Sequence, residues 1–230
     1  MKRFLILMLS LLLLCGCAAK GSGQKVDAKP ELVTKEDSGT QGDCRYENPY
    51  LTLSGVSAST AKLFDTYYAG IHDEYARRLR ADAKAGATSF TVEYAQRALT
   101  SRVLSVLRTC RVENPETVTV TPAGETFDPQ TGLQLSAVSL FACPKEVADV
   151  RVLDLVRARL EAGECFGFAG EEAELAADWS DKLERAYDRE QFVLTESGYL
   201  VYFLPGKLAE DAIGVYLPYR ELQDILVLPS

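Results

Sequence analysis

"FVLTESGYLVYFL", Phe192 to Leu204, is the stretch that decides the fold. Two apolar runs rich in Val, Phe, Tyr and Leu flank the pair Ser197-Gly198. A Ser-Gly pair between two strand-like runs predicts a β-hairpin, and the strands of a hairpin are antiparallel. The stretch therefore predicts an antiparallel sheet in the last third of the chain.

Outward from the hairpin, strand-like and helix-like segments mix without the regular alternation of a βαβ protein. Apolar spacings of three and four predict helices over residues 59–84, 145–162 and 171–187. Strands are expected over residues 50–54, 89–94, 102–112, 117–121 and 133–141, and 214–226 reads as a strand followed by a short terminal helix. We therefore predict an α+β fold, in which an antiparallel sheet has its helices packed on one face.

The N-terminus carries the signature of an export signal. Lys2 and Arg3 precede an apolar run over residues 4–14, which at eleven residues is too short to span a membrane, because a spanning helix needs about 20. The residues that follow are similar to the lipobox of bacterial lipoproteins, with Leu14 three positions and Gly16 one position before Cys17. Cys17 is therefore the predicted lipidation site; the alternative is an ordinary secretory signal cut nearby.

The domain organisation follows from this signal. We expect a lipoprotein signal peptide over residues 1–16 and a lipidated N-terminus with a flexible polar tether over residues 17–43. The α+β domain then comprises an N-terminal part, 44–124, and a C-terminal part, 125–230. Acyl chains such as palmitate on Cys17 would hold the protein at the outer face of the bacterial cytoplasmic membrane.

Charge and cysteine content narrow the class of partner. Loss of Lys2 and Arg3 with the signal changes the formal net charge from −8 to −10, which disfavours nucleic acid and favours a basic partner. Four cysteines remain besides Cys17, and an even number outside the cytoplasm predicts two disulfides. Cys143 and Cys165 lie at opposite ends of a predicted helix and are too far apart to pair. Two sets of pairs stay open: Cys44–Cys143 with Cys110–Cys165, or Cys44–Cys165 with Cys110–Cys143.

The sequence offers little that is typical of a catalytic centre. The one histidine, His72, lies on the first predicted helix with no nucleophile near it in sequence, so we interpret it as a solvated or partly packed helix residue. Phosphate-binding loops, nucleophile elbows and metal-binding spacings are not recognisable. We therefore predict no enzymatic activity, no cofactor and no metal.

An acidic stretch is the clearest surface feature. Between Glu161 and Glu190 the chain has ten acidic and three basic residues. On the helix predicted over 171–187, Leu175, Trp179, Leu183 and Tyr187 would form the buried side, and four acidic residues would lie opposite: Glu171, Glu174, Asp178 and Asp181. These four form a candidate patch for a cationic partner; the alternative is a solvated helix face without such a role.

Two stretches resemble a known family. They are "ETFDPQTGLQLSAVSLF", Glu125 to Phe141, and "QFVLTESGYLVYFLPGKLAEDAIGVYLPYREL", Gln191 to Leu222. Both are similar to segments of the extracytoplasmic domain of the lysozyme-sensing anti-sigma factors (RsiV-like), a domain also found in lipoproteins and beside peptidoglycan deacetylases. The resemblance implies an α+β binding module without catalysis of its own, which captures lysozyme or a cell-wall component.

Two other classes of function stay open at this stage. One is an enzyme of the cell envelope that acts on glycan through paired carboxylates. The other is a scaffold lipoprotein whose partner is another membrane protein.

Overall fold

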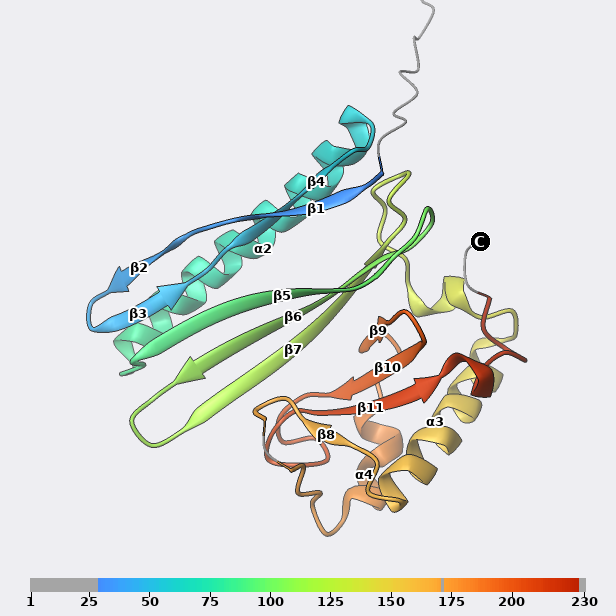
Figure 1. Cartoon of the computed structure of the whole chain (residues 1–230). Helices are drawn as coiled ribbons and strands as arrows, with labels where there is room; N and C mark the ends of the chain where they lie inside the picture. The colour runs from blue at the N-terminus through green and yellow to red at the C-terminus, as the bar shows by residue number, and fades with distance from the viewer. Residues whose placement is uncertain (1–28, 171, 228–230) are drawn as a thin grey trace, which may run out of the picture.

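The computed structural model describes residues 29–170 and 172–227. These form four layers, in the order helix, sheet, sheet, helices (Figure 1). The mixed α+β class with mostly antiparallel strands is confirmed, but the strands form three sheets rather than one. The elements are β1 Glu31–Lys35, β2 Ser38–Gln41, β3 Cys44–Glu47, β4 Tyr50–Ser54, α2 Ala58–Lys84, β5 Ser89–Leu99, β6 Leu104–Glu113, β7 Val118–Phe127, η1 Ala137–Leu140, α3 Lys145–Glu161, β8 Phe166–Gly167, α4 Trp179–Ala186, β9 Phe192–Leu194, β10 Gly198–Phe203, β11 Ile213–Pro218 and η2 Tyr219–Glu221.

A long N-terminal hairpin begins the fold. β1 pairs with β4 as a two-stranded sheet, and β2 pairs with β3 at the edge of a five-stranded sheet of order β2-β3-β5-β6-β7. The pair β3–β5 is parallel, because β4 and α2 connect these two strands. The prediction that the tether extends to residue 43 is therefore wrong: residues 31–41 contribute β1 and β2 to the folded part, and residues 17–28 lie outside the described residues.

Helix α2 covers one face of the five-stranded sheet. Ser57 caps its first turn, since the Ser57 hydroxyl accepts a hydrogen bond from the backbone N–H of Thr60 at 3.1 Å. The helix ends just before Gly86, whose φ of 100° lies in the left-handed region. Its buried side chains include Phe64 and Tyr68, which are fully enclosed against β4, β6 and β7. The predicted helix over 59–84 is confirmed within one residue.

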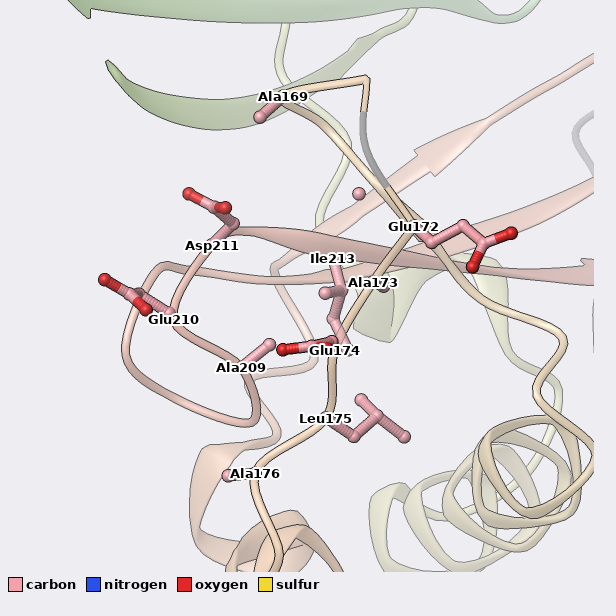
Figure 2. Close-up of a pocket in the computed structure, with 11 residues that line it drawn as sticks. Ala169, Glu172, Ala173, Glu174, Leu175, Ala176, Ala209, Glu210, Asp211 and Ile213 are labelled. Carbon is pink, nitrogen blue, oxygen red and sulfur yellow. The ribbon is translucent and has the colours of Figure 1, made fainter. Parts of the chain in front are cut away.

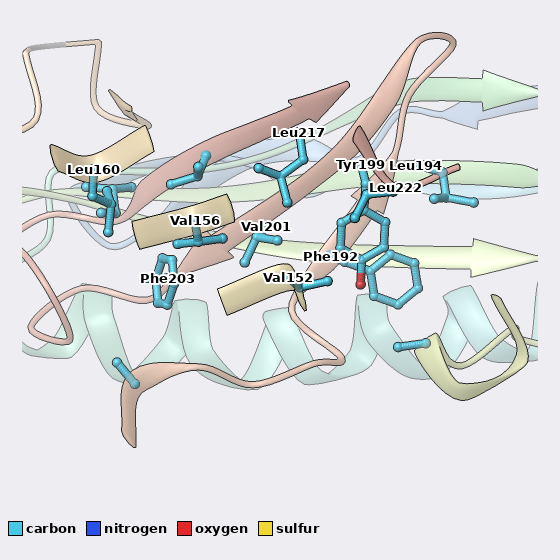
Figure 3. Packing of buried hydrophobic residues seen from close by; sticks show 14 of the residues in the cluster. Val152, Val156, Leu160, Phe192, Leu194, Tyr199, Val201, Phe203, Leu217 and Leu222 are labelled. Atoms are coloured by element: carbon cyan, nitrogen blue, oxygen red, sulfur yellow. The ribbon is translucent and has the colours of Figure 1, made fainter. Parts of the chain in front are cut away.

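Helices α3 and α4 cover one face of a four-stranded sheet of order β8-β11-β10-β9. Alternate residues of β10, namely Tyr199, Val201 and Phe203, point into this core. Figure 3 shows them close to side chains of α3, among them Val152 and Val156. The predicted hairpin is confirmed: β9 and β10 pair antiparallel with Leu194 opposite Tyr199.

The two larger sheets pack face to face through a small apolar layer. Leu107 of β6 lies against Val193, Leu200 and Tyr202 of the four-stranded sheet. The backbones approach closely at Gly124 of β7, where an added Cβ would lie 2.0 Å from the carbonyl oxygen of Phe192. The backbone N–H of Gly124 also donates to the Tyr202 hydroxyl at 2.8 Å. The five-stranded sheet thus has α2 on one face and the four-stranded sheet has α3 and α4 on one face. The opposite faces of these two sheets pack against each other.

Three predicted elements differ from the structure. Residues 133–141 form no strand: Leu135 pairs briefly with Thr126, and the chain then turns into η1. The helix predicted over 171–187 begins only at Trp179, because Leu175 is extended and bridges to Ala209. The expected terminal helix is the single turn η2. In addition, β7 continues through the predicted division at residue 124 and ends at Phe127.

The predicted disulfides are not formed. Cys44, Cys110, Cys143 and Cys165 are all free thiols in the structure. Cys44 and Cys110 belong to the core beneath α2, whereas Cys143 and Cys165 pack against the core beneath α3. Every pair in the two sets that the sequence left open would have to cross the stacked sheets. The exclusion of Cys143–Cys165 agrees with the structure, in which α3 separates the two residues.

Candidate functional site

An acidic pocket lies beside the free edge of β8, between two loops. One loop leads from β8 to α4 and the other connects β10 to β11. The backbone N–H of Ala176 donates to the carbonyl of Leu208 at 2.8 Å, and that of Phe168 donates to Ala212 at 3.0 Å. These bonds and the Leu175–Ala209 bridge hold the two loops together. The pocket between them has a volume of about 430 Å³.

The lining of this pocket carries charge of one sign. It includes four carboxylates, from Glu172, Glu174, Glu210 and Asp211, and no basic side chain. In Figure 2 the carboxylates of Glu174, Glu210 and Asp211 point to the same side, whereas that of Glu172 points away. Alanine and glycine supply much of the remaining wall, so the carboxylates stand on a shallow backbone surface. Such a site attracts cationic groups and disfavours anions.

The structure brings together only part of the acidic patch that the sequence predicts. Glu174 lines the pocket, but it does so from an extended segment and not from a helix. Asp178 lies at the N-cap of α4, where a hydrogen bond from Lys182 lowers the pKa of its carboxyl. Asp181 is in the first turn of α4, outside the pocket lining, and Glu171 lies outside the described residues.

Three pocket carboxylates lie outside the patch that the sequence predicts: Glu172, Glu210 and Asp211. Glu172 is a neighbour of the predicted residues, whereas Glu210 and Asp211 lie in the β10–β11 loop, in a short acidic pair that apolar periodicity does not mark. The signal that does exist is the acidic pair itself, because it follows a predicted strand and the turn-forming residues Pro205 and Gly206.

A second surface feature is an aromatic face on the four-stranded sheet. Phe166 of β8 and Tyr216 of β11 lie on the face opposite α3, and they are 43% and 37% exposed. Each ring lies over a glycine: an added Cβ would be 2.4 Å from Phe166 at Gly214 and 2.5 Å from Tyr216 at Gly198. The outer edge of each ring therefore packs over a glycine, and the exposed part of each ring is available to an apolar or ring-shaped ligand.

A buried charged cluster beneath α2 is the third candidate. Arg108 Nη2 lies 2.9 Å from Glu125 Oε1, and the Tyr68 hydroxyl donates to Glu125 Oε2 at 3.2 Å. Burial raises the pKa of Glu125 to about 7, although Arg108 opposes the shift. Burial lowers the pKa of Arg108, but the attraction of Glu125 and of nearby tyrosines outweighs it and raises that pKa above its ordinary value, so the guanidinium stays charged. The cluster is closed to solvent and holds β6, β7 and α2 together, so we assign it to the fold rather than to a site.

His72 joins α2 to the N-terminal hairpin. Its Nε2 lies 2.8 Å from Asp37 Oδ2, and its ring meets the ring of Tyr50 edge-on with centroids 5.2 Å apart. The predicted partly packed histidine is therefore a contact between layers. Among residues 29–170 and 172–227, no group of three or more His, Cys, Asp or Glu side chains is placed to hold a metal ion. In the same ranges, no helix combines the length and the apolar character needed to cross a bilayer.

Comparison with known proteins identifies the fold. No protein-family profile matches the chain, and a search of curated proteins also found no match. The crystal structure of a DUF3298 family protein from Pseudomonas aeruginosa PAO1 is similar, with a TM-score of 0.57, 14% identity, and coverage of 87% of this chain and 94% of that one. The chain shares the fold of DUF3298 proteins.

A second solved structure agrees. A member of the DUF3298 family from Bacteroides fragilis NCTC 9343 has a TM-score of 0.52 and 10% identity, over 88% of this chain and 94% of that chain. At these identities the likeness establishes the fold alone. The DUF3298 domain has no assigned function, so the likeness leaves the ligand to be argued from the pockets and faces of this chain.

Proposed function

We propose that the chain is a binding module, anchored by a lipid on Cys17 at the outer face of the cytoplasmic membrane, and that it captures a basic protein such as a lysozyme. The observation that carries this proposal is the acidic pocket, whose lining has four carboxylates and no basic side chain. The lipobox around Cys17 and the resemblance to lysozyme-sensing ectodomains support it from the sequence.

The physical basis is electrostatic attraction at an accessible site. Glu172, Glu174 and Glu210 are exposed, so a lysine or arginine of the partner reaches them without a large desolvation cost. The formal net charge of −10 after loss of the signal adds a long-range attraction, which raises the association rate at low ionic strength. Binding of this kind weakens as salt screens the charges.

A titration tests the proposal. Full-length protein in detergent is immobilised, and lysozyme binding is measured by biolayer interferometry across a series of salt concentrations. The triple variant Glu174→Gln, Glu210→Gln, Asp211→Asn should bind at least tenfold more weakly at low salt. A matched control is Glu116→Gln with Glu146→Gln and Asp154→Asn, which removes three carboxylates outside the acidic pocket. Absence of binding by the unaltered protein at low salt would reject lysozyme as the ligand.

The anchor has its own test. Metabolic labelling with a fatty-acid probe should mark the protein and the variant Cys15→Ser, but not Cys17→Ser. Labelling that survives in Cys17→Ser would contradict the proposed lipidation site.

The aromatic face favours a second candidate, capture of a cell-wall glycan. Sugar rings present apolar C–H faces, and flat exposed aromatic rings such as Phe166 and Tyr216 stack on them. Sedimentation with purified peptidoglycan tests this candidate. The variant Phe166→Ala with Tyr216→Ala should remain in the supernatant while the triple acidic variant still sediments, and the opposite result would assign glycan binding to the acidic pocket.

A further inference from the structure

A second pocket, on the other side of the β10–β11 loop, has the opposite charge. It lies between the N-terminal turn of α3, the end of α4 and the β10–β11 loop, and its volume is about 400 Å³. Its charged residues are four cations, Lys145, Arg185, Arg189 and Lys207, and two anions, Asp149 and Asp188. A formal charge of +2 thus collects in one pocket of an acidic chain.

The pocket contains one buried guanidinium that is only partly paired. The Arg189 side chain is 10% exposed. Its Nε and Nη2 both donate to Asp149 Oδ1, at 3.1 and 2.5 Å, and Nη2 also donates to the carbonyl of Lys145 at 3.1 Å. Its Nη1 is enclosed and has no hydrogen-bond partner among the described residues. A buried donor without a partner is rare in folded proteins, because its desolvation is not compensated.

One further polar atom of this pocket is also enclosed without a partner among residues 29–170 and 172–227. It is Oε1 of Gln191, which lines the same pocket as Arg189. Arg189 offers a donor, whereas Gln191 offers an acceptor. One ligand that both accepts and donates hydrogen bonds would satisfy both.

Two other cations of the pocket, Arg185 and Lys207, are available to bind an anion. Asp149 Oδ2 lies 3.7 Å from Lys145 Nζ, and Asp149 Oδ1 forms an ion pair with Arg189, so the Asp149 carboxylate offsets part of the charge of both cations. Arg185 and Lys207 are exposed, and neither forms an ion pair with any residue that the structure describes. They belong to different elements, α4 and the β10–β11 loop, and face the same pocket.

We propose that this pocket binds a phosphate ester whose organic part carries hydroxyl groups. Arg185, Arg189 and Lys207 contact the phosphate oxygens, since guanidinium and ammonium groups are the usual donors to phosphate. Asp188 and Gln191 accept hydrogen bonds from the hydroxyl groups. The volume of about 400 Å³ exceeds that of a phosphate ion and accommodates a small polyol attached to it. The site and its ligand class are independent of the acidic pocket.

Calorimetric titration of the full-length protein with glycerol 3-phosphate, inorganic phosphate and sulfate tests the proposal. We expect saturable binding of the ester, at least tenfold tighter than that of either inorganic ion. Equal affinity for all three would overturn the ester assignment, and no detectable heat with any of them at low ionic strength would overturn the site.

Variants then locate the binding. Arg185→Gln with Lys207→Gln removes two exposed cations and should weaken ester binding at least tenfold, with an unchanged circular dichroism spectrum. Lys182→Gln is the matched control, because Lys182 lies on the same helix and pairs with Asp178 outside this pocket. An equal loss in the control, or no loss in the double variant, would overturn the proposal. Lysozyme binding by the double variant should persist, which distinguishes a failure here from a failure of the acidic site.

Discussion

Arg108 and Glu125 form an ion pair inside the protein, with 2.9 Å between Arg108 Nη2 and Glu125 Oε1 on the adjacent strands β6 and β7. Only 9% of the arginine side chain and 2% of the glutamate side chain are exposed. The Arg108 guanidinium also lies 5.0 Å from the centre of the Tyr75 ring. A buried pair adds little net stability, because desolvation offsets the attraction, but loss of one partner leaves a buried charge uncompensated.

Replacement of one partner should therefore be costly. We expect Arg108→Met to lower the free energy of unfolding by about 3–5 kcal/mol. Urea denaturation, monitored by circular dichroism, measures the free energy of unfolding of the variant. Arg111→Met is the control, since Arg111 lies on the same strand in an exposed pair with Glu113 and should cost less than about 1 kcal/mol. Equal losses for the two variants would contradict a buried ion pair.

The penalty of Arg108→Met should depend on pH. Burial raises the pKa of Glu125 from its ordinary 4.5 to about 7, and removal of Arg108 raises it further. A raised pKa in the folded state gives a stability contribution that is complete below pH 4.5 and is lost as pH rises through the folded pKa. The destabilisation should thus be smaller at about pH 5.5 than at about pH 8.5, as urea curves at both values will show. A penalty that does not change with pH would argue against the buried glutamate as its cause.

Alkaline pH should unfold the protein cooperatively. Burial raises the pKa of eight tyrosines, Tyr67, Tyr68, Tyr75, Tyr94, Tyr187, Tyr199, Tyr202 and Tyr219, and it brings the pKa of Tyr67, Tyr202 and Tyr219 to about 12. The neutral phenols favour the folded state, so stability is complete below the ordinary pKa of 10 and falls as pH rises toward 12. Tyrosinate absorbance and circular dichroism should change together in this range. Ionisation of all tyrosines near pH 10 with an unchanged fold would refute it.

Glycine at position 124 should be required for the contact between the sheets. We expect Gly124→Ala to destabilise the protein by about 1–3 kcal/mol, because its Cβ would collide with backbone at Phe192 that cannot move freely. Gly70→Ala is the control within α2, where nothing lies within 4 Å of an added Cβ. That change should stabilise by about 0.5–1 kcal/mol through helix propensity. Thermal denaturation compares the stability of the two variants with that of the unaltered protein. A Gly124→Ala variant as stable as the unaltered protein would mean that the sheets lie farther apart.

The cysteines should be reduced in the native protein. After denaturation without reductant, Cys44, Cys110, Cys143 and Cys165 should all be alkylated. Under native conditions Cys143 and Cys165 should react first, because Cys44 and Cys110 are 1% and 0% exposed and burial raises the pKa of the Cys110 thiol to about 11. Peptide mass spectrometry reads the result. Cysteines that resist alkylation until a reductant is added would show that the native protein does contain disulfides.

The elements that the sequence predicted well are those whose pattern is local. The helix α2, the helix α3 and the β9–β10 hairpin each bury a regularly spaced apolar face, so neighbouring residues suffice to recognise them. Strands β1 and β2 have largely exposed side chains and are held by backbone hydrogen bonds. A polar strand of this kind has the composition of a tether, which is why the boundary at residue 43 was wrong.

The candidate sites were less accessible to sequence reasoning. Glu174 was recognised from charge, but Glu210 joins it through a meeting of two loops that no local pattern encodes. Arg108 could have been recognised as buried from the sequence. It occupies a core-facing position in the alternation through Leu104, Val106 and Cys110. A charge at such a position implies a buried partner, although the identity of Glu125 depends on the strand register.

The separation of the apolar cores has a consequence for the dynamics of the chain. Four residues are buried between the two sheets, against twenty-one in the core beneath α3 and α4. We therefore expect one half of the molecule to open more easily than the other, and native-state hydrogen exchange should resolve two foldons with separate opening energies. A partner that bridges both halves would couple their opening and stabilise the whole protein.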